Sequence, residues 1–355
     1  MLDFTSALYL GLYHPSDSLP AWSKFTTGVP AALASPPGAA EVALKIARLQ
    51  TCEHGMLGTS TFHLFWDFFG MLVPHAVKVY VDTGLYPIAR WGLERAAARS
   101  VTIREFGHHD PEAFRSLLKQ DGRGRLRPVL VTDGFCPDCG EPAPLSEYLE
   151  SLRTFGGRLI VDDTQALGIF GHSPGPDAPY GRQGGGMLPR LQVGGPDVLV
   201  ISSLAKGFGA PLAALSGSRS AVQRFKAKSE TLVHCSPPAL PAIRAAQQAL
   251  RANRRHGDRL RLRLAGLVTR FRQRAKSAGL RFTGGLFPVQ TLAPASNADT
   301  RRLHEQLLHR GIRTVLRRAL HGPGLRISFV ITARHTSEAV DRAIDELAEI
   351  YPAKA

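Results

Sequence analysis

The chain has 355 residues, of which 44% are hydrophobic, and a formal net charge of +15 at pH 7. This length and apolar content can bury a large core and favour one large domain with a smaller partner. No apolar run approaches the roughly 20 residues that span a bilayer, and an acid, Asp3, stands where a signal peptide has basic residues; we therefore expect a cytoplasmic protein without a membrane span.

Hydroxyl side chains precede the first strongly apolar helical segment. Thr59, Ser60 and Thr61 follow Gly58 and lead into the run 62–69. Hydroxyls and backbone N–H groups at a helix start suit a bound phosphate, and the same pattern also serves as an ordinary helix N-cap. The run 62–69 holds five aromatic rings in eight positions, more than one helix face can bury against its own sheet. We therefore expect part of it at the interface of a homodimer.

Short apolar segments alternate with amphipathic helical segments through the first part of the chain. Residues 212–216 fit an antiparallel return strand. The other predicted core strands are 77–81, 100–103, 128–132, 158–161 and 198–202. Strands that alternate with helices favour an α/β protein with a mostly parallel sheet. Because ligands bind at the carboxyl ends of strands in such sheets, the polar residues at those ends are candidates for a site.

Two of the four cysteines form a single C-x-x-C pair. Cys136 and Cys139 make this pair, whereas Cys52 and Cys235 stand alone. A zinc site needs a second pair of ligands, and a thiol redox motif needs a following helix. Because the pair has neither in the sequence around it, we expect no metal site.

Two strand ends carry ionisable side chains that suit one another. Lys206 stands between the strand 198–202 and a glycine-flanked turn, and Asp162 follows the strand 158–161. An amine attacks an aldehyde only when neutral, so a lysine whose pKa is lowered by burial suits a Schiff base. Pyridoxal phosphate (PLP) needs such a lysine, together with a carboxylate that keeps its pyridine nitrogen protonated. Either residue alone is typical of a loop or a turn, but the pair in this order predicts a PLP site.

Much of the positive charge lies between Arg251 and Lys276. Leu260, Leu264 and Phe271 recur there at helical spacing, which predicts one amphipathic helix with a basic face. This face fits a solvated surface, or a docking site for an acidic partner such as an acyl carrier protein or the phosphates of coenzyme A. The arginines lack the interleaved aromatic platform of a stacking site, so we expect no nucleic acid.

The pattern of elements changes after about residue 250. The long helix is followed by a predicted strand at 287–292, a helix around 303–308 and a strand at Arg326. We therefore expect an N-terminal segment that contributes to a small domain and an interface, then a large PLP-binding domain, then a small C-terminal α/β domain. The predicted bounds of these parts are 1–39, 40–248 and 249–355.

Ordered segments along the chain resemble the α-oxoamine synthases, a family of fold-type I PLP enzymes. The segments that carry this resemblance are 3–12, 131–134, 140–145, 161–168, 203–209, 235–239 and 325–328. The resemblance runs from about Asp3 to about Leu347. It implies a large domain with a mostly parallel seven-stranded sheet. It also implies condensation of an amino acid with an acyl thioester, of coenzyme A or an acyl carrier protein, with decarboxylation to an α-amino ketone.

The resemblance also implies roles for single residues. Lys206 would hold the cofactor and remove the α-proton of the substrate, Asp162 would face the pyridine nitrogen, and Tyr86 would stack on the ring, with His63 as an alternative. Arg326 would clamp the substrate carboxylate bidentately. The other cofactor-binding residues that it implies are Gln165, Ser203, Asp133, Thr59, Ser60 and Thr61.

Departures from the family pattern bear on the reaction. Gln165 stands where the family usually has a histidine, and an amide cannot relay a proton near pH 7. The family's glycine-rich segment is replaced by residues 26–38. These departures keep a PLP aminotransferase open as an alternative. A non-catalytic partner subunit is a further alternative, but such subunits lose the lysine, and Lys206 is present.

Overall fold

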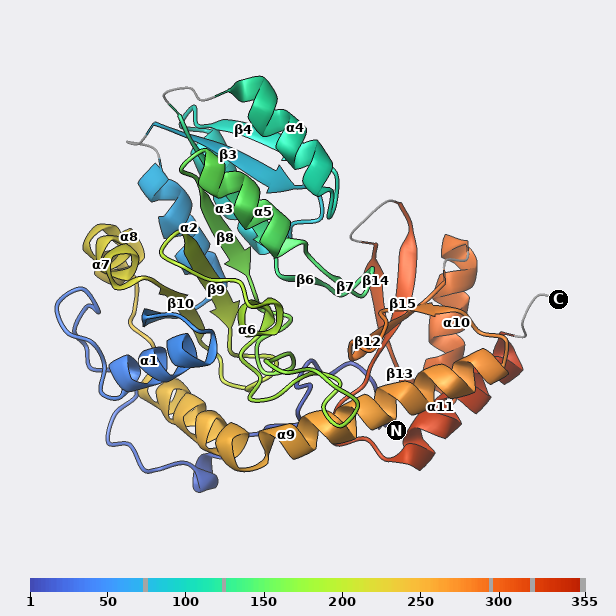
Figure 1. Cartoon of the computed structure of the whole chain (residues 1–355). Coiled ribbons are helices and arrows are strands. Elements are labelled where there is room, and N and C mark those ends of the chain that lie inside the picture. Colours follow the sequence, from blue (N-terminus) through green and yellow to red (C-terminus); the bar gives the residue numbers. More distant parts are fainter. Residues whose placement is uncertain (73–75, 123–125, 294–295, 320–322, 352–355) are drawn as a thin grey trace.

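A seven-stranded sheet forms the centre of a large domain in the computed structural model (Figure 1), which describes residues 1–72, 76–122, 126–293, 296–319 and 323–351. Its strands are β2 (His54–Gly58), β3 (Val77–Asp82), β4 (Thr102–Phe106), β5 (Arg127–Asp133), β8 (Arg158–Asp162), β9 (Val198–Ser203) and β10 (Ala213–Gly217). Their order is β2-β10-β9-β8-β5-β3-β4, and only the two pairs that involve β10 are antiparallel. The predicted mostly parallel seven-stranded sheet is therefore confirmed.

Two strands differ from the sequence prediction. The strand predicted at 100–103 begins later, at Thr102, because Ser100 takes a positive φ of 63° in the turn that follows the preceding helix. The edge strand β2 was not predicted at all. Its sequence, HGMLG, contains two glycines, which weaken the apolar pattern that marks a strand.

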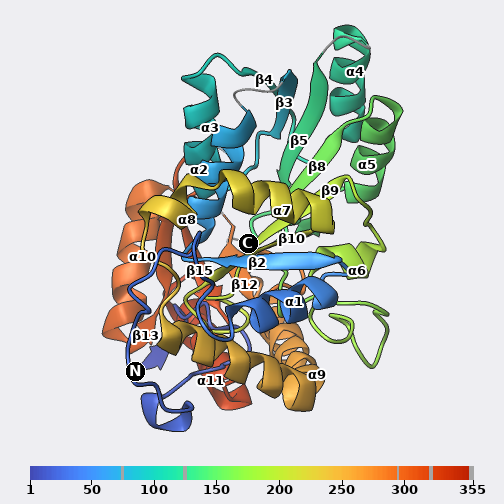
Figure 2. The ribbon, with the colours of Figure 1, turned by 90° about the vertical axis from the view of Figure 1, so that its left-hand side faces the viewer.

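Helices cover both faces of this sheet. They are α1 (Ala39–Leu49), α2 (Thr61–Leu72), α3 (Pro87–Ala97), α4 (Pro111–Asp121), α5 (Leu145–Thr154), α6 (Met187–Leu191), α7 (Arg219–Lys228) and α8 (Glu230–His234). Helices α2, α3 and α7 share one apolar cluster with the sheet, and α4, α5 and α6 share another. In Figure 2 the edge strand β2 lies between α7 and α1.

The remaining elements form a smaller C-terminal unit. They are α9 (Leu240–Ser277), β11 (Phe282–Thr283), β12 (Val289–Leu292), α10 (Asn297–His309), β13 (Ile312–Arg313), β14 (Val315–Arg318), β15 (Leu325–Val330) and α11 (Ser337–Ile350). Four of the strands make an antiparallel sheet in the order β11-β12-β15-β14. The N-terminal strand β1 (Leu2–Asp3) pairs in parallel with β13.

Helix α9 connects the two units. It runs as one helix along the base of the molecule, beneath both units (Figure 1). The predicted boundary at 248/249 lies inside this helix, so the chain crosses from one unit to the other without a flexible linker. In the part of the chain that the structure describes, no helix is long and apolar enough to cross a membrane.

Candidate active site

The predicted site residues converge on the carboxyl edge of the large sheet. Ser203 at the end of β9 pairs with Ala213, whose other partner is Gly58 at the end of β2. On the other side, Asp162 at the end of β8 pairs with Asp133 at the end of β5. Because these strand ends lie in one row, the residues that follow them in the chain meet above the same edge.

Lys206 lies in the turn after β9 and faces an aromatic ring. Its Nζ atom is 5.4 Å from the centre of the Tyr86 ring. Burial lowers the pKa of Lys206, and the charges of Asp162 and Asp133 only partly oppose this effect. Burial therefore favours the neutral amine, the form that attacks an aldehyde.

Three carboxyl groups are buried at the ends of β5 and β8, and the charges of two of them, Asp162 and Asp133, act on Lys206. Burial raises the pKa of Asp162, although the N–H of Thr164, which donates to Oδ1 at 3.0 Å, lowers it. Burial and the charge of Asp162 raise the pKa of Asp133 well above its ordinary value. Asp163 accepts the N–H of Met187 at 3.0 Å and so holds the start of α6. Burial makes the charged form of a carboxyl group unfavourable, and a cation beside the group stabilises that form. Asp162 is placed to receive such a cation.

Tyr86 stands directly before α3, and its backbone N–H donates to Oδ1 of Asp133 at 3.3 Å. Burial, followed by the charges of Asp162 and Asp133, raises the pKa of Tyr86, while the charge of Arg317 opposes the rise. Tyr86 is therefore a neutral ring beside the lysine. His63, the alternative stacking residue, lies with its Nδ1 2.7 Å from the hydroxyl of Ser60.

Gln165 contacts Tyr9, a residue for which the sequence predicts no role. The hydroxyl of Tyr9, which is buried, donates to Oε1 of Gln165 at 2.8 Å. This bond fixes the amide orientation and directs its Nε2 group, a donor, to the other side. Tyr9 lies within the segment 3–12 that resembles the family, but no spacing in the sequence relates it to Gln165.

The hydroxyl residues after β2 form a helix cap. Ser60 Oγ accepts the backbone N–H of His63 at 3.4 Å, the usual N-cap bond for α2. Thr59 donates to the carbonyl of Ser236 at 3.3 Å. Ser60 is therefore an N-cap residue of α2. The phosphate role of Thr59, Ser60 and Thr61 stays a prediction. Ser203 accepts the N–H of Ala205 at 3.2 Å through its hydroxyl.

Arg326 lies on β15, in the smaller unit. Its cross-strand partner is Arg317, so the two side chains share one face of the small sheet. Arg317 forms an ion pair with Asp138 of the large domain, which shows that this face is turned toward the large domain. The guanidinium of Arg326 donates to the carbonyl of Leu325 at 2.9 Å. Arg326 therefore lies on the face turned toward the large domain, but the structure directs its guanidinium to a local carbonyl and not to Lys206.

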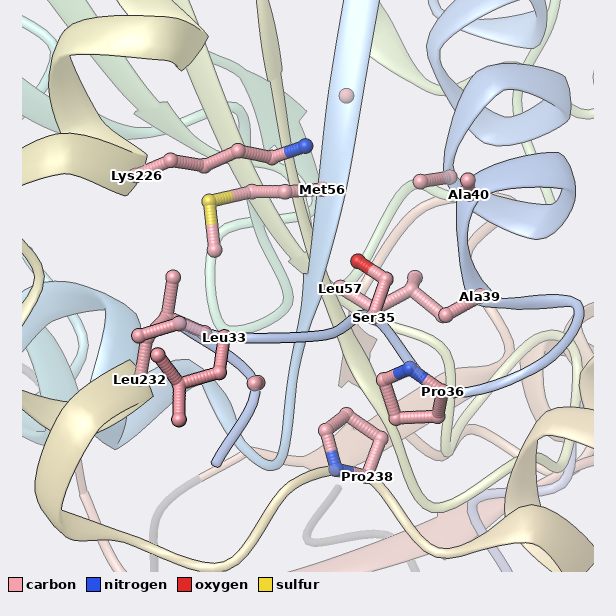
Figure 3. A pocket seen from close by; sticks show the side chains of 14 residues that line it. Leu33, Ser35, Pro36, Ala39, Ala40, Met56, Leu57, Lys226, Leu232 and Pro238 are labelled. Carbon is pink, nitrogen blue, oxygen red and sulfur yellow. The ribbon is translucent and has the colours of Figure 1, made fainter. Parts of the chain in front are cut away.

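A cavity of 290 Å³ lies along β2, away from these residues (Figure 3). Leu33 and Pro36 of the N-terminal segment, Met56 and Leu57 of β2, and Lys226 of α7 line it. None of the predicted cofactor-binding side chains lines it, so it is a separate pocket.

The fold and the arrangement of lysine and carboxylate at the sheet edge define a fold-type I architecture. The chain belongs to the aminotransferase class I and II family, whose sequence model matches residues 57–347.

Two sequence relatives are 8-amino-7-oxononanoate synthases. That of Pseudescherichia vulneris is 30% identical over 262 residues, which cover 72% of this chain and 64% of that protein. That of Sodalis glossinidius is 28% identical over 361 residues, which cover 98% of this chain and 87% of that protein. A solved serine palmitoyltransferase from S. paucimobilis with a bound PLP–myriocin adduct has a TM-score of 0.84 at 15% identity, covering 98% of this chain and 86% of that one. The predicted resemblance to α-oxoamine synthases is thereby confirmed.

Proposed function

We propose that the chain is a PLP-dependent transferase of the α-oxoamine synthase type. It would condense an amino acid with an acyl thioester, of coenzyme A or an acyl carrier protein, and release carbon dioxide to give an α-amino ketone. One observation carries the proposal: the amino group of Lys206 lies 5.4 Å from the Tyr86 ring centre, at the sheet edge where Asp162 is buried. The names of the sequence relatives and the PLP in the S. paucimobilis enzyme support it.

The donor set at the sheet edge fits PLP. When bound, PLP supplies an aldehyde for covalent attachment and a protonated ring that accepts electrons from a substrate carbon. Lys206 offers the amine, and buried Asp162 would hold the proton on the ring nitrogen. Nε2 of Gln165, oriented by Tyr9, would donate to the ring hydroxyl oxygen. Tyr86 would cover the ring.

The other side chains position the amino acid and its proton. Lys206, once released from the cofactor, would remove the α-proton, because burial favours its neutral form. Arg326 would bind the substrate carboxylate after its guanidinium leaves the carbonyl of Leu325. The position of Arg326 on the face turned toward the large domain supports this role.

The experiment separates the two candidate reactions. The purified protein is incubated with single amino acids and acyl thioesters, and both carbon dioxide and the α-amino ketone are measured. We expect both products to require the thioester and to vanish in Lys206→Ala. Amino transfer to a keto acid without carbon dioxide release would contradict the synthase and identify an aminotransferase.

Gln165 is the residue that keeps the aminotransferase as a second candidate, because its amide cannot relay a proton. In a synthase, Gln165→His should preserve or raise thioester-dependent activity, since the imidazole adds a proton relay. In an aminotransferase adapted to glutamine, the same change should reduce turnover. Gln165→Leu, which removes the donor to the ring hydroxyl, is the control and should reduce activity in both cases.

The proposed assembly is a homodimer. Phe62 and Trp66 of α2 and Trp91 of α3 are each at least 37% exposed, and the ring of Phe62 lies 5.9 Å from that of Trp66 and 6.5 Å from that of Trp91. An exposed three-ring patch of this kind supports burial against a second copy. The cytoplasmic location stays a prediction from the sequence.

A further inference from the structure

Three metal-binding side chains from two separate segments lie together near the carboxyl edge of the large sheet, and a fourth, Cys136, contacts one of the three. His108 and His109 follow β4, while Cys136 and Cys139 lie in the small hairpin of β6 (Phe135–Cys136) and β7 (Glu141–Pro142). One nitrogen each of His108 and His109 and the Sγ atom of Cys139 all lie within 4.8 Å of one another. The backbone N–H of Cys139 donates to Sγ of Cys136 at 3.5 Å, which keeps the two thiols together.

We propose that His108, His109, Cys136 and Cys139 bind one Zn²⁺ ion as a closed, structural site. The sequence predicts no metal site, because the C-x-x-C pair has no second pair of ligands nearby in the sequence. The fold supplies that pair from the loop after β4. Two thiolates and two imidazoles are a ligand set that zinc prefers, and four protein ligands leave no open position for catalysis. The proposal goes beyond the proposed function and does not depend on it.

The spacing of the ligand atoms suits zinc. Nε2 of His108 lies 3.6 Å from Sγ of Cys139. With Zn–S about 2.3 Å and Zn–N about 2.0–2.1 Å, a tetrahedral site separates a sulfur and a nitrogen ligand by about 3.6 Å. These two side chains therefore need no rearrangement to bind the ion.

Asp82 orients both histidines from behind. Its Oδ1 lies 2.8 Å from Nδ1 of His108, so Nε2 of that ring is the atom that faces Cys139. Its Oδ2 accepts the backbone N–H of His109 at 3.1 Å. A buried carboxylate behind the far ring nitrogen is the usual support of a metal-bound histidine. Asp82 is buried, so this support is held in place by the core.

His109 provides an independent sign of a missing ligand. Its φ of 53° is unusual for a residue with a side chain, and its ring lies with its centroid 3.7 Å from that of His108, at an interplanar angle of 30°. Nε2 of His109 is buried and makes no hydrogen bond of ordinary geometry among the residues that the structure describes, while the His109 ring interacts with the Cys139 thiol. A bound cation would satisfy this nitrogen.

The hairpin places the site at the junction with the smaller unit. The N–H of Gly140 donates to the carbonyl of Cys136 at 2.9 Å and closes the turn at a φ of +80°. A Cβ at Gly140 would lie 2.5 Å from the carbonyl carbon of Gly284, so the turn packs directly on the smaller unit. Asp138, between the two cysteines, forms the ion pair with Arg317. Zinc would thus fix the hairpin that connects the two units.

The test measures zinc in the reduced holoenzyme without any assay of turnover. After gel filtration in metal-free buffer, we expect about one zinc per chain by mass spectrometry of the metal. Cys139→Ser and His109→Gln should each lower this content at least tenfold. Cys235→Ser and His256→Gln change the same residue types elsewhere and should keep it. The cofactor absorbance and far-UV circular dichroism of each variant report whether it has folded.

A second measurement covers a variant that fails to fold. The metal-depleted wild-type protein is titrated with Co²⁺, which should give a thiolate charge-transfer band and the intense d–d bands of a tetrahedral site. The site is disproved if the reduced wild type neither retains zinc nor takes up cobalt, or if either ligand variant keeps a full equivalent of zinc. A Cys136–Cys139 disulfide that binds no metal after reduction would also disprove it.

Discussion

Asp162 and Asp163 are neighbours in the sequence, and their surroundings give them different roles. Asp163 accepts the N–H of Met187 at 3.0 and 3.2 Å with its two oxygens, so both serve the loop that leads to α6. Asp162 accepts a backbone N–H at Oδ1 from Thr164, and its charge interacts with Lys206. Asp162 is therefore the better candidate to face a positively charged ring.

The variant Asp162→Asn tests this assignment. It should keep the covalent cofactor, because Lys206 is intact, but should lower exchange of the substrate α-proton by about 100-fold or more, because a neutral pyridine is a poor electron acceptor. Exchange is measured by NMR in deuterated water. If Asp162→Asn exchanges at the wild-type rate while Asp163→Asn does not, the two roles are reversed.

The pKa of Lys206 predicts how cofactor uptake depends on pH. The neutral amine is the reactive form, so the rate of PLP attachment to the apoprotein should rise as pH rises through this pKa. Because burial lowers the pKa of Lys206, the midpoint should lie below the ordinary value of about 10.4. Asp133→Asn removes a charge that raises this pKa, so its midpoint should move to lower pH.

Stopped-flow absorbance measures this rate, and Lys206→Ala gives the baseline. A midpoint at or above that of free lysine would show that Lys206 is not desolvated. A midpoint that rises in Asp133→Asn would show that Asp133 does not act on the lysine as a negative charge.

Several arginines of the basic helix α9 make contacts within the protein. Arg270 and Arg274 form ion pairs with Asp341 and Asp345 on α11. Arg261 is only 2% exposed, and its NH1 donates to the carbonyl of Gly168 at 2.8 Å. The ion pairs of Arg270 and Arg274 therefore join two helices of the smaller unit, and Arg261 joins α9 to the large domain. The docking surface predicted for this helix is therefore limited to its remaining exposed arginines.

Removal of Arg261 should destabilise the protein. Arg261→Met leaves the carbonyl of Gly168 and the Oδ1 of Asn253 without this donor, so we expect a loss of about 2–4 kcal/mol in the free energy of unfolding. Arg259→Met, on the exposed side of the same helix, should change it by less than about 0.5 kcal/mol. Urea denaturation followed by circular dichroism measures both. If both variants lose the same free energy of unfolding, the cause is the loss of a charge on the helix and not the loss of the buried contacts of Arg261.

The whole molecule is two units joined by a continuous helix and by the pairing of β1 with β13. The proposed site draws Lys206, Asp162 and Tyr86 from the large domain and would take Arg326 from the smaller one. The exposed rings of Phe62, Trp66 and Trp91 lie on helices that cover the large sheet. At the scale of the whole molecule, the property to test is therefore whether the chain forms a homodimer.

Light scattering at micromolar concentration tests the homodimer. The wild type should have twice the 38.5 kDa mass of the chain. Trp91→Glu places a charge in the aromatic patch and should shift the mass toward one chain, because an unpaired charge is costly to bury. Leu262→Glu replaces a similarly exposed apolar residue on α9 and should leave the dimer intact. A wild type that is monomeric and still binds PLP would contradict the proposal.

The α/β class, the positions of most core strands along the chain and the candidates Lys206 and Asp162 could be predicted from the sequence alone. This was possible because strand periodicity and the strand-end position of binding residues are local properties of the chain. The local pattern did not predict β2, because the glycines of that strand weaken its apolar pattern. It also placed the start of β4 too early, because a turn precedes that strand.

Only the tertiary structure brought together residues that no spacing connects. It placed Tyr9 on Gln165, turned Asp163 away from the site, and directed Arg326 to the carbonyl of Leu325. It also set His108 and His109 beside Cys139. These contacts depend on which strand ends become neighbours in the sheet, and long-range pairing of this kind is decided by the packing of the whole chain rather than by any one segment.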